Sequence, residues 1–576
     1  MKKNILLVML NVIPLFLLAQ VENGTSYNYK ISEVYNVNNK INFSSTHPID
    51  QFLFHESESL ISIKMYGTSA YSLNKDMCFQ KFDASTLELI NSYVEKDFIS
   101  TMYHELENII KINDRICIFY SLYNKEEFKE QLFVREIDCI TGQVIGSDKL
   151  IIDISGKLQI EKCDNNNNNN NNNNTVYKKF RLKLSPDSSK IFIHYEKKIS
   201  KKDKLASNNN DIGLCIINTN FEIIWKKEVK LPYIKDQMKY IDFAFDKKNR
   251  VYILATVSDQ NSINDKLSTF HLELFQITSD NDNIRSSKIE VGGKQIKEMF
   301  ISELSNGNVF LAGFYSYTCK IGKDGFPKVR DEGFSANFYS HPDAKGIFTA
   351  KVGANGEIID VSSYDIPIDI INQYESEKQI RKNNKKDNPE IEHLGLKNVI
   401  ILEDQSSLII GERSYSKSLP KDGYSYHFDD ILVAKINYDG KLTWMKKIPK
   451  KQIAYSNSIP AMSFKYFFDK ETHNFLFKDN KENADIKTLL NPKPCKSVDD
   501  NFYLFQINDD NGDINKSQFI DNENTEGIKV AILFWKNAAQ LSANRFVFEA
   551  LKIPKKERDI WIKKEHILID IDFNKK

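Results

Sequence analysis

The residues of this sequence that could bind a metal ion are two histidine–aspartate pairs. One residue separates His341 from Asp343, and one residue separates His427 from Asp429. Imidazole nitrogens and carboxylate oxygens are common ligands of zinc and similar ions, so the two pairs could contribute to one site if their loops met. Both pairs lie in polar stretches, where solvated side chains are the simpler interpretation. We therefore predict no metal site and no cofactor.

An acidic turn with the letters DDNGD, Asp509–Asp513, is the second pattern that could do chemistry. It begins like a calcium-binding loop, but Ile514 and Ile520 occupy the positions where that loop needs a glycine and a bidentate glutamate. We interpret the segment as an ordinary turn. The G-x-S-x-G and H-E-x-x-H motifs and the sialidase-type aspartate box do not occur in the sequence. No catalytic residue is therefore predicted.

Aromatic side chains in polar stretches of the chain are the remaining candidates, and they favour binding. The stretches are 315–345, 372–393 and 412–429, and the first and third mix tyrosine and phenylalanine with charged residues. Tyrosine-rich loops on a rigid scaffold are typical of recognition surfaces, although the rings could instead pack the loops onto that scaffold. The candidate binding residues are Tyr317, Arg330, Phe334, Phe338, Arg413, Tyr424, Tyr426 and Asp429.

The elements that must position these loops are β-hairpins, which recur along the whole chain. The segment 431–449, ILVAKINYDGKLTWMKKIP, alternates apolar and polar residues around Asp439 and Gly440, a pair typical of a tight hairpin turn. A fainter copy, DIGLCIINTNFEIIW, occupies 211–225. Strongly apolar strands begin near residues 60, 116, 191, 251, 309, 408, 475 and 546, with a mean spacing of about 69 residues.

Repeated pairs of hairpins with almost no helical periodicity predict an all-β fold, a β-propeller with eight four-stranded blades. Seven blades with an appended hairpin is the alternative. A row of sandwich domains is disfavoured because no linker rich in proline, glycine or serine divides the chain. Since an open ring would expose strand edges, we expect the strand-like segment 26–37 to complete the last blade and close the ring.

Propeller topology brings the three candidate stretches together. In a four-stranded blade, the loop between strands two and three opens on the same face as the connection to the next blade. The stretches 315–345, 372–393 and 412–429 are connections of these two kinds in the expected blades five and six. The sequence therefore predicts one binding surface at these neighbouring blades, with Arg330, Arg413 and Asp429 at its polar rim.

Two short segments carry a resemblance to known families. The ending Asp439, Gly440, Lys441 and Trp444 resembles the repeat of quinoprotein-type bacterial propellers, in which a tryptophan docks neighbouring blades. The segment 184–193, LSPDSSKIFI, resembles the repeat of bacterial propellers related to the TolB type. Tryptophan recurs at that position in only two blades and Asp360 occupies it in another, and no cofactor-binding motif matches. The resemblance therefore implies a propeller and not quinone-dependent chemistry.

The N-terminus has the pattern of a secretory signal peptide. Lys2 and Lys3 precede an apolar run that is short for a membrane span and ends at the small residue Ala19. We expect residues 1–19 to be removed, and 20–576 to form a single propeller domain without a membrane span. The polyasparagine run near 164–175 is expected to be a surface insertion. The seven cysteines are irregularly spaced and do not suggest a disulfide framework.

Composition limits the partners. Lysine plus arginine (79) and aspartate plus glutamate (78) nearly cancel, so no strong field for nucleic acid is expected. The sequence predicts a non-catalytic recognition or scaffold protein of the bacterial cell envelope or exterior, in the periplasm, at the surface or secreted, that binds a protein or glycan. The alternative is a hydrolase or lyase that acts on an extracellular polymer at the central channel. Fold alone does not separate the two.

Overall fold

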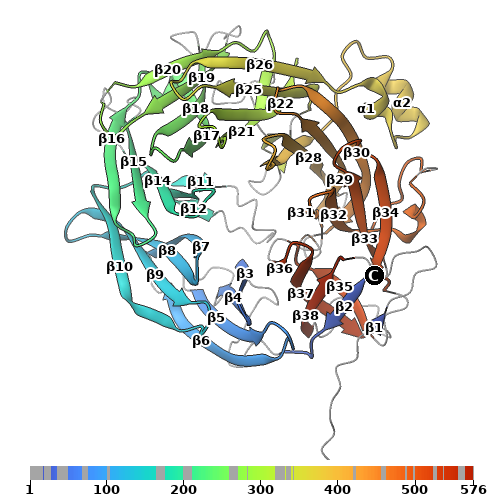
Figure 1. Cartoon of the computed structure of the whole chain (residues 1–576), viewed down its shortest axis with the longest axis horizontal. Helices are drawn as coiled ribbons and strands as arrows, with labels where there is room; N and C mark the ends of the chain where they lie inside the picture. Colours follow the sequence, from blue (N-terminus) through green and yellow to red (C-terminus); the bar gives the residue numbers. More distant parts are fainter. Residues whose placement is uncertain are drawn as a thin grey trace, which may run out of the picture.

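Seven four-stranded antiparallel sheets and the six-stranded sheet of the last blade form a ring in the computed structural model, which confirms the eight-bladed propeller (Figure 1). The structure describes residues 17–18, 27–35, 50–67, 75–99, 104–163, 176–198, 211–258, 270–281, 283–317, 331–332, 339–341, 343–419, 423–455, 459, 462–486, 489–496, 500–522, 528–535, 538–554 and 565–574. No helix in these ranges has the length and apolar character needed to cross a membrane. Each sheet corresponds to one of the eight predicted repeats.

The first four blades follow one another along the chain, each with its first strand nearest the centre of the ring (Figure 1). Blade one contains β3 (Asp50–Glu56), β4 (Ser59–Gly67), β5 (Lys75–Asp83) and β6 (Leu89–Ile99). Blade two contains β7 (His104–Ile112), β8 (Arg115–Asn124), β9 (Lys129–Asp138) and β10 (Val144–Ser155). Blade three contains β13 (Phe180–Leu184), β14 (Lys190–Glu196), β15 (Asp211–Asn218) and β16 (Ile223–Lys230). Blade four contains β17 (Met238–Phe245), β18 (Val251–Ser258), β19 (Phe270–Ile277) and β20 (Arg285–Ile289).

The next three blades repeat this order, with longer strands in blade six. Blade five contains β21 (Gln295–Glu303), β22 (Val309–Ser316), β25 (Gly346–Val352) and β26 (Ile358–Asp365). Blade six contains β27 (Leu394–Ile401), β28 (Ser407–Ser418), β29 (Tyr424–Ile436) and β30 (Leu442–Ala454). Blade seven contains β31 (Lys465–Phe468), β32 (Thr472–Asp479), β33 (Asn501–Asn508) and β34 (Ile514–Ile520). The segment Asp509–Asp513 is the turn between β33 and β34, as predicted.

The last blade joins the two ends of the chain. Its strands from the C-terminal region are β35 (Ile528–Leu533), β36 (Ala539–Ser542), β37 (Arg545–Pro554) and β38 (Glu565–Asp572). The N-terminal strand β2 (Asn28–Ile31) pairs antiparallel with β38, so a blue strand lies among red ones in Figure 1. This pairing confirms the predicted closure, and it covers an edge of β38 that would otherwise be open. A two-residue strand, β1 (Leu17–Leu18), pairs with β2.

The remaining described elements are short. They are β11 (Glu161–Cys163), β12 (Val176–Lys178), β23 (Asp331–Glu332), β24 (Tyr339–Ser340), the 3-10 helices η2 (Lys235–Gln237) and η4 (Lys481–Asn483), and the α-helices α1 (Ile368–Asn372) and α2 (Glu377–Asn383). The two α-helices lie between blades five and six, within and beside the predicted insertion at 372–393. The insertion at 164–175 and most of residues 1–19 lie outside the described residues, so the signal peptide stays a prediction.

Apolar side chains between neighbouring blades form the core. The second strand of most blades is almost wholly buried; in β22, for example, all eight side chains are buried. Each of the large core clusters combines strands of two adjacent blades, such as β18 with β21 and β22. Because every blade buries both faces of its sheet against neighbours, stability depends on ring closure as well as on individual hairpins.

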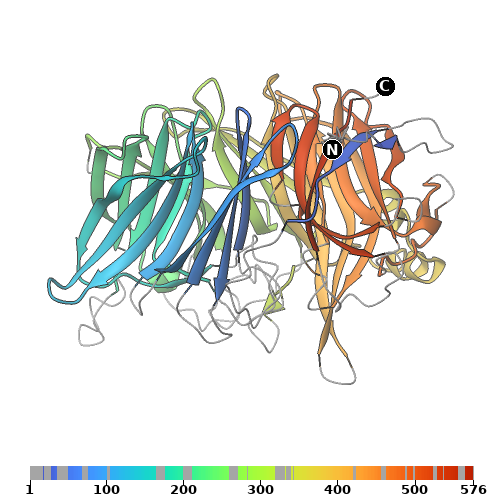
Figure 2. The same ribbon diagram turned by 90° about the horizontal axis from the view of Figure 1, so that it is seen from below.

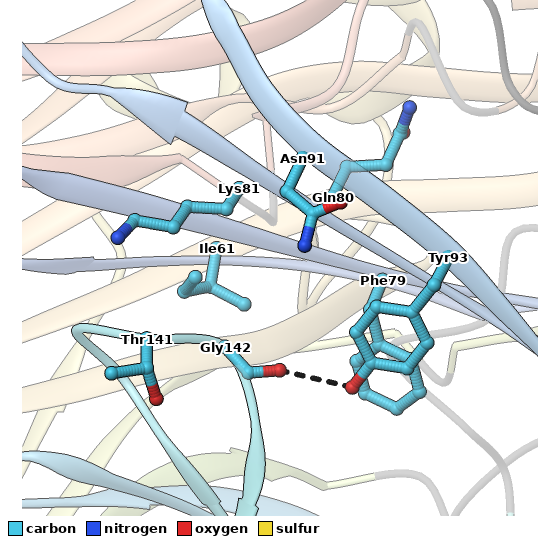
Figure 3. A pocket seen from close by; sticks show the side chains of 8 residues that line it. All are labelled: Ile61, Phe79, Gln80, Lys81, Asn91, Tyr93, Thr141 and Gly142. Carbon is cyan, nitrogen blue, oxygen red and sulfur yellow. Dashed lines mark hydrogen bonds between the residues drawn. The ribbon is translucent and has the colours of Figure 1, made fainter.

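Outermost strands dock onto the next blade through hydrogen bonds to turn carbonyls. Trp444 Nε1 donates to the Asp509 carbonyl at 2.9 Å, and Trp225 Nε1 donates to the Asn249 carbonyl at 3.0 Å. In blade one a tyrosine takes this role, because Tyr93 Oη donates to the Gly142 carbonyl at 2.9 Å (Figure 3). The crevice beside this bond measures about 10 Å³, room for one water molecule and not for a ligand. The expectation that a tryptophan docks neighbouring blades is confirmed at Trp444.

Carboxylates fasten successive innermost strands to one another. Glu107 in β7 accepts hydrogen bonds from Phe180 N at 3.1 Å and from Ser121 Oγ at 2.6 Å. Asp242 in β17 accepts one from Ile301 N in β21 at 3.1 Å. Both carboxylates lie where the innermost strand has a β-bulge, which turns an extra side chain towards the next blade. The bulges thus satisfy backbone donors across the blade boundary.

Candidate functional site

The described parts of the three predicted insertions lie together on one face of the propeller. Ser316 Oγ donates to Glu390 Oε1 at 2.7 Å, which joins the end of β22 to the segment after α2. Arg413 in β28 donates from Nε to the Glu392 carbonyl at 3.1 Å, and Ser414 N donates to the His393 carbonyl at 2.9 Å. The prediction from topology that the insertions of blades five and six are neighbours therefore holds for their described parts.

The third insertion is a hairpin arm and not a loose loop. Strands β28 and β29 continue their pairing from Ser407↔Ile436 outward to Ser418↔Tyr424, with one irregularity near Glu412. The arm extends beyond the rest of the ring, at the bottom of Figure 2, on the side where α1 and α2 lie. Paired strands hold the described part of the arm in place by a ladder of backbone hydrogen bonds.

Buried and partly buried ion pairs fix the root of the arm. Arg413 Nη1 lies 3.0 Å from Glu375 Oε1 and 3.4 Å from Asp430 Oδ2. Lys447 Nζ, whose side chain is 1% exposed, lies 3.1 Å from the same Asp430 oxygen. Although burial opposes ionisation of Asp430, Lys447 and Arg413 hold its pKa below the ordinary value. The four groups tie β28, β29, β30 and the helical segment together.

A second buried group lies beside the first. Glu412 Oε1 is 2.8 Å from Lys450 Nζ, and neither side chain is exposed. Glu412 Oε2 is 3.0 Å from Lys397 Nζ in the innermost strand β27. Burial alone would raise the pKa of Glu412, but Lys450 and Lys397 lower it from 4.5 to about 2. An ionised carboxylate therefore joins three of the four strands of blade six.

A stacked aromatic group covers one side of the arm. The His427 ring stacks on the Tyr415 ring with centroids 4.6 Å apart, and the centroid of the His393 ring lies 5.0 Å from that of Tyr415. Tyr415 Oη donates to Asp429 Oδ2 at 2.9 Å, and burial raises the pKa of Asp429. Burial and the nearby lysines 417, 451 and 496 lower the pKa of His427 to about 4. These groups are enclosed and bonded, which suits a structural role.

The predicted binding residues divide into two groups in the structure. Tyr317 is 42% exposed, and Tyr424 and Tyr426 are partly exposed, with Tyr426 packed against a cluster that includes Ile459 and Met462. Arg413 and Asp429 do not lie at an exposed rim, since both belong to the buried groups at the root of the arm. Arg330, Phe334 and Phe338 lie outside the described residues.

Three lysines near the arm were missed by the sequence reasoning. Lys417 and Lys496 are exposed and Lys451 is partly exposed, and they come from β28, from the segment after Cys495 and from β30. The segment at Cys495 pairs with Gln452 of β30, which brings Lys496 beside the arm. Among the described residues, no carboxylate lies within 4.0 Å of these three ammonium groups. Lysine is frequent throughout this chain, so the sequence offers no signal for their convergence.

The histidine–aspartate pair at 341–343 does not join the pair at 427–429 in a metal site. His341 Nδ1 lies 3.0 Å from Glu298 Oε1, and its ring covers Gly395, where a Cβ atom would lie 2.3 Å from Nδ1. Asp343 instead accepts a hydrogen bond from His393 N at 3.1 Å. In the part of the chain that the structure describes, no cluster of three or more His, Cys, Asp or Glu residues could hold a metal ion.

A pocket of about 300 Å³ lies at the opposite mouth of the ring, where the turns between first and second strands of blades three to six converge. Apolar residues line part of it, namely Pro186, Phe245, Leu304, Ile401 and Leu402. The carboxylate residues of the lining are Asp187, Asp246, Glu303 and Glu403, and the cationic ones are Lys190 and Lys247; serines and Gln405 complete it. Each of these turns has the composition of an ordinary β-turn, so the sequence gives no signal for a pocket.

Comparisons with known proteins give no family. No family model and no curated protein matches the chain. The β-propeller domain of the Trilobed protease from Pyrococcus furiosus is 11% identical and aligns over 83% of this chain and 97% of its own, with a TM-score of 0.31. The WD40 domain of SCAP from fission yeast is 10% identical over 95% and 98%, with a TM-score of 0.35. The polysaccharide lyase Uly1 is 8% identical over 82% and 90%, with a TM-score of 0.31. Similarities this distant carry no argument about activity, and the likeness of single repeats to quinoprotein-type and TolB-type propellers stays a prediction.

Proposed function

We propose that this protein is a non-catalytic recognition or scaffold propeller that binds a protein or glycan through the face carrying the β28–β29 arm. One observation carries the proposal: a hairpin extends beyond the ring and is anchored at its root by buried ion pairs. An anchored arm loses little conformational entropy when a partner binds, which favours affinity. Tyr317 and Tyr424 supply aromatic contact area on this face.

The charge near the arm indicates what the partner would carry. Lys417, Lys451 and Lys496 lie together without carboxylate partners among the described residues, in a chain whose overall charge nearly cancels. Carboxylate or sulfate groups of a glycan, or acidic side chains of a protein, would complement them. The signal-like N-terminus supports a location at the cell envelope or exterior.

The acid and histidine groups of this face support recognition over hydrolysis or elimination. A general base must reach the proton that it removes, and its oxygen or nitrogen must be free to do so. Asp429 and His427 are 7% and 8% exposed and are bonded to Tyr415 and Ser425. Glu298 is held by His341 and Leu396. Each of these groups makes at least one hydrogen bond within the face, although Asp429 Oδ1 has no hydrogen-bond partner among the described residues.

The test is partner capture by two variants. Replacing Tyr317 and Tyr424 together with alanine should weaken capture of envelope glycans or proteins by about 2 kcal/mol or more, with the melting temperature nearly unchanged. The matched control is Tyr438→Ala, which removes a tyrosine that is 49% exposed in the turn before β30. If the double variant instead unfolds early, or binds as the wild type does, the tyrosines are packing residues and the proposed surface is wrong.

A further inference from the structure

The pocket at the opposite channel mouth has the size and fixed floor of a small-molecule site. Its volume of about 300 Å³ lies at the lower end of the range for such sites. Phe245, Leu304 and Leu402 are 5%, 3% and 8% exposed, so they belong to the packed blades and cannot turn away. Four consecutive blades contribute turns to the wall, which makes the shape a property of the ring.

The two lysines of the lining, Lys190 and Lys247, neutralise its four carboxylates only in part. Lys190 Nζ is turned to the neighbouring turn, where it donates to the Lys247 carbonyl at 2.9 Å and to Asn249 Oδ1 at 2.6 Å. Lys247 is exposed, and its backbone N–H donates to Glu303 at 3.0 Å. Asp246 is already paired with Arg250. Asp187, Glu303 and Glu403 therefore leave the mouth with an excess of negative charge.

Glu303 is the carboxylate best placed to receive a cation. It is partly buried at the end of β21, and Oε2 accepts only the bond from Lys247 N among the described residues. Burial raises the pKa of this carboxyl, Asp246 adds to the rise, and Lys247 and Arg250 oppose it. A partly desolvated carboxylate without an ion-pair partner gains from a cation more than a solvated one does.

We propose that this pocket binds a small organic cation that carries an ammonium group on an apolar stem. The ammonium group lies against Glu303, with Asp187 and Glu403 nearby. The stem lies against Phe245, Leu304 and Leu402. This site is independent of the arm, because the turns between first and second strands and the arm open on opposite faces of the ring.

The experiment uses three probes that share one stem and differ in charge. Phenethylamine, 2-phenylethanol and 3-phenylpropionate are titrated into the full-length protein by calorimetry and ligand-observed NMR. The amine should bind at least tenfold more tightly than the alcohol, and the acid should not bind. Since a bound cation lowers the pKa of Glu303, amine binding at mildly acidic pH should release protons, which calorimetry in two buffers measures.

The variant Glu303→Gln removes the charge and keeps an oxygen for Lys247 N, so it should fold normally. It should lose tenfold or more of the amine affinity and the proton release. The control Glu377→Gln, in α2 at 84% exposure, should change neither. Equal binding of amine and alcohol, or amine binding that survives Glu303→Gln, would overturn the proposal. Binding that is equally weak for all three probes would overturn it as well.

Discussion

The substitution Glu412→Gln tests whether buried charge anchors the arm. It keeps the size of the side chain and leaves Lys450 buried without its anionic partner, while Lys450 Nζ retains the Phe428 carbonyl at 2.7 Å. A fall in the pKa of Glu412 from 4.5 to about 2 corresponds to about 3 kcal/mol of folding free energy at neutral pH. Breaking one partner of a buried ion pair costs about 3–5 kcal/mol in general, so the two estimates agree.

The pH dependence gives the prediction a second readout. Because the pKa of Glu412 is lower in the folded state, its contribution is complete above about 4.5 and is lost as the pH falls towards 2. Urea unfolding followed by tryptophan fluorescence should therefore show a large gap between Glu412→Gln and wild type at pH 7, and a narrower gap at pH 4. Glu377→Gln should match the wild type at both. A variant as stable as the wild type at pH 7, or a gap independent of pH, would refute the reasoning.

Three further outcomes are expected. Trp444→Phe keeps the ring but loses the bond to the Asp509 carbonyl, so urea unfolding should show a loss of about 1 kcal/mol. Deletion of residues 1–31 removes β2 from the last blade, so limited proteolysis should cut the shortened chain within β38 before other blades. Burial raises the pKa of Glu107 from 4.5 to about 7 in the folded state. The wild-type free energy of unfolding should therefore decrease as the pH rises from 4.5 to 7, whereas that of Glu107→Gln should change little over this range.

The sequence was sufficient for the ring because a propeller is built from local signals. Alternating apolar residues and turns such as Asp439-Gly440 mark each hairpin, and Gly440 adopts a φ of +83° as the turn requires. The number of repeats and the strand-like N-terminal segment together predicted that this segment, which contains β2, closes the ring. Neighbouring insertions followed from the order of loops alone, without knowledge of any side-chain contact.

The burial of Arg413 and Asp429 could not be predicted from the same signals. A stretch rich in charge between two strands is typical of an exposed loop. The contacts that enclose these residues come from Glu375 of the helical insertion, which pairs with Arg413, and from Tyr415, which donates to Asp429. Only the three-dimensional arrangement shows that these charges neutralise one another inside the protein. The pocket at the other mouth could not be predicted for the same reason, because turns from four blades converge there without any common motif.

The two faces of the ring therefore differ in how charge is used. On the face with the arm, carboxylates such as Glu412 and Asp430 are buried against lysine and arginine, while Lys417 and Lys496 are exposed beside the arm. At the other mouth, Lys190 is bonded to a neighbouring turn and Glu303 forms no ion pair among the described residues, so the carboxylates of the pocket outnumber its lysines. A protein whose total charge nearly cancels can in this way present opposite charges to different ligands. Titrating the two proposed sites separately would show whether occupation of one changes the affinity of the other through the shared blades five and six.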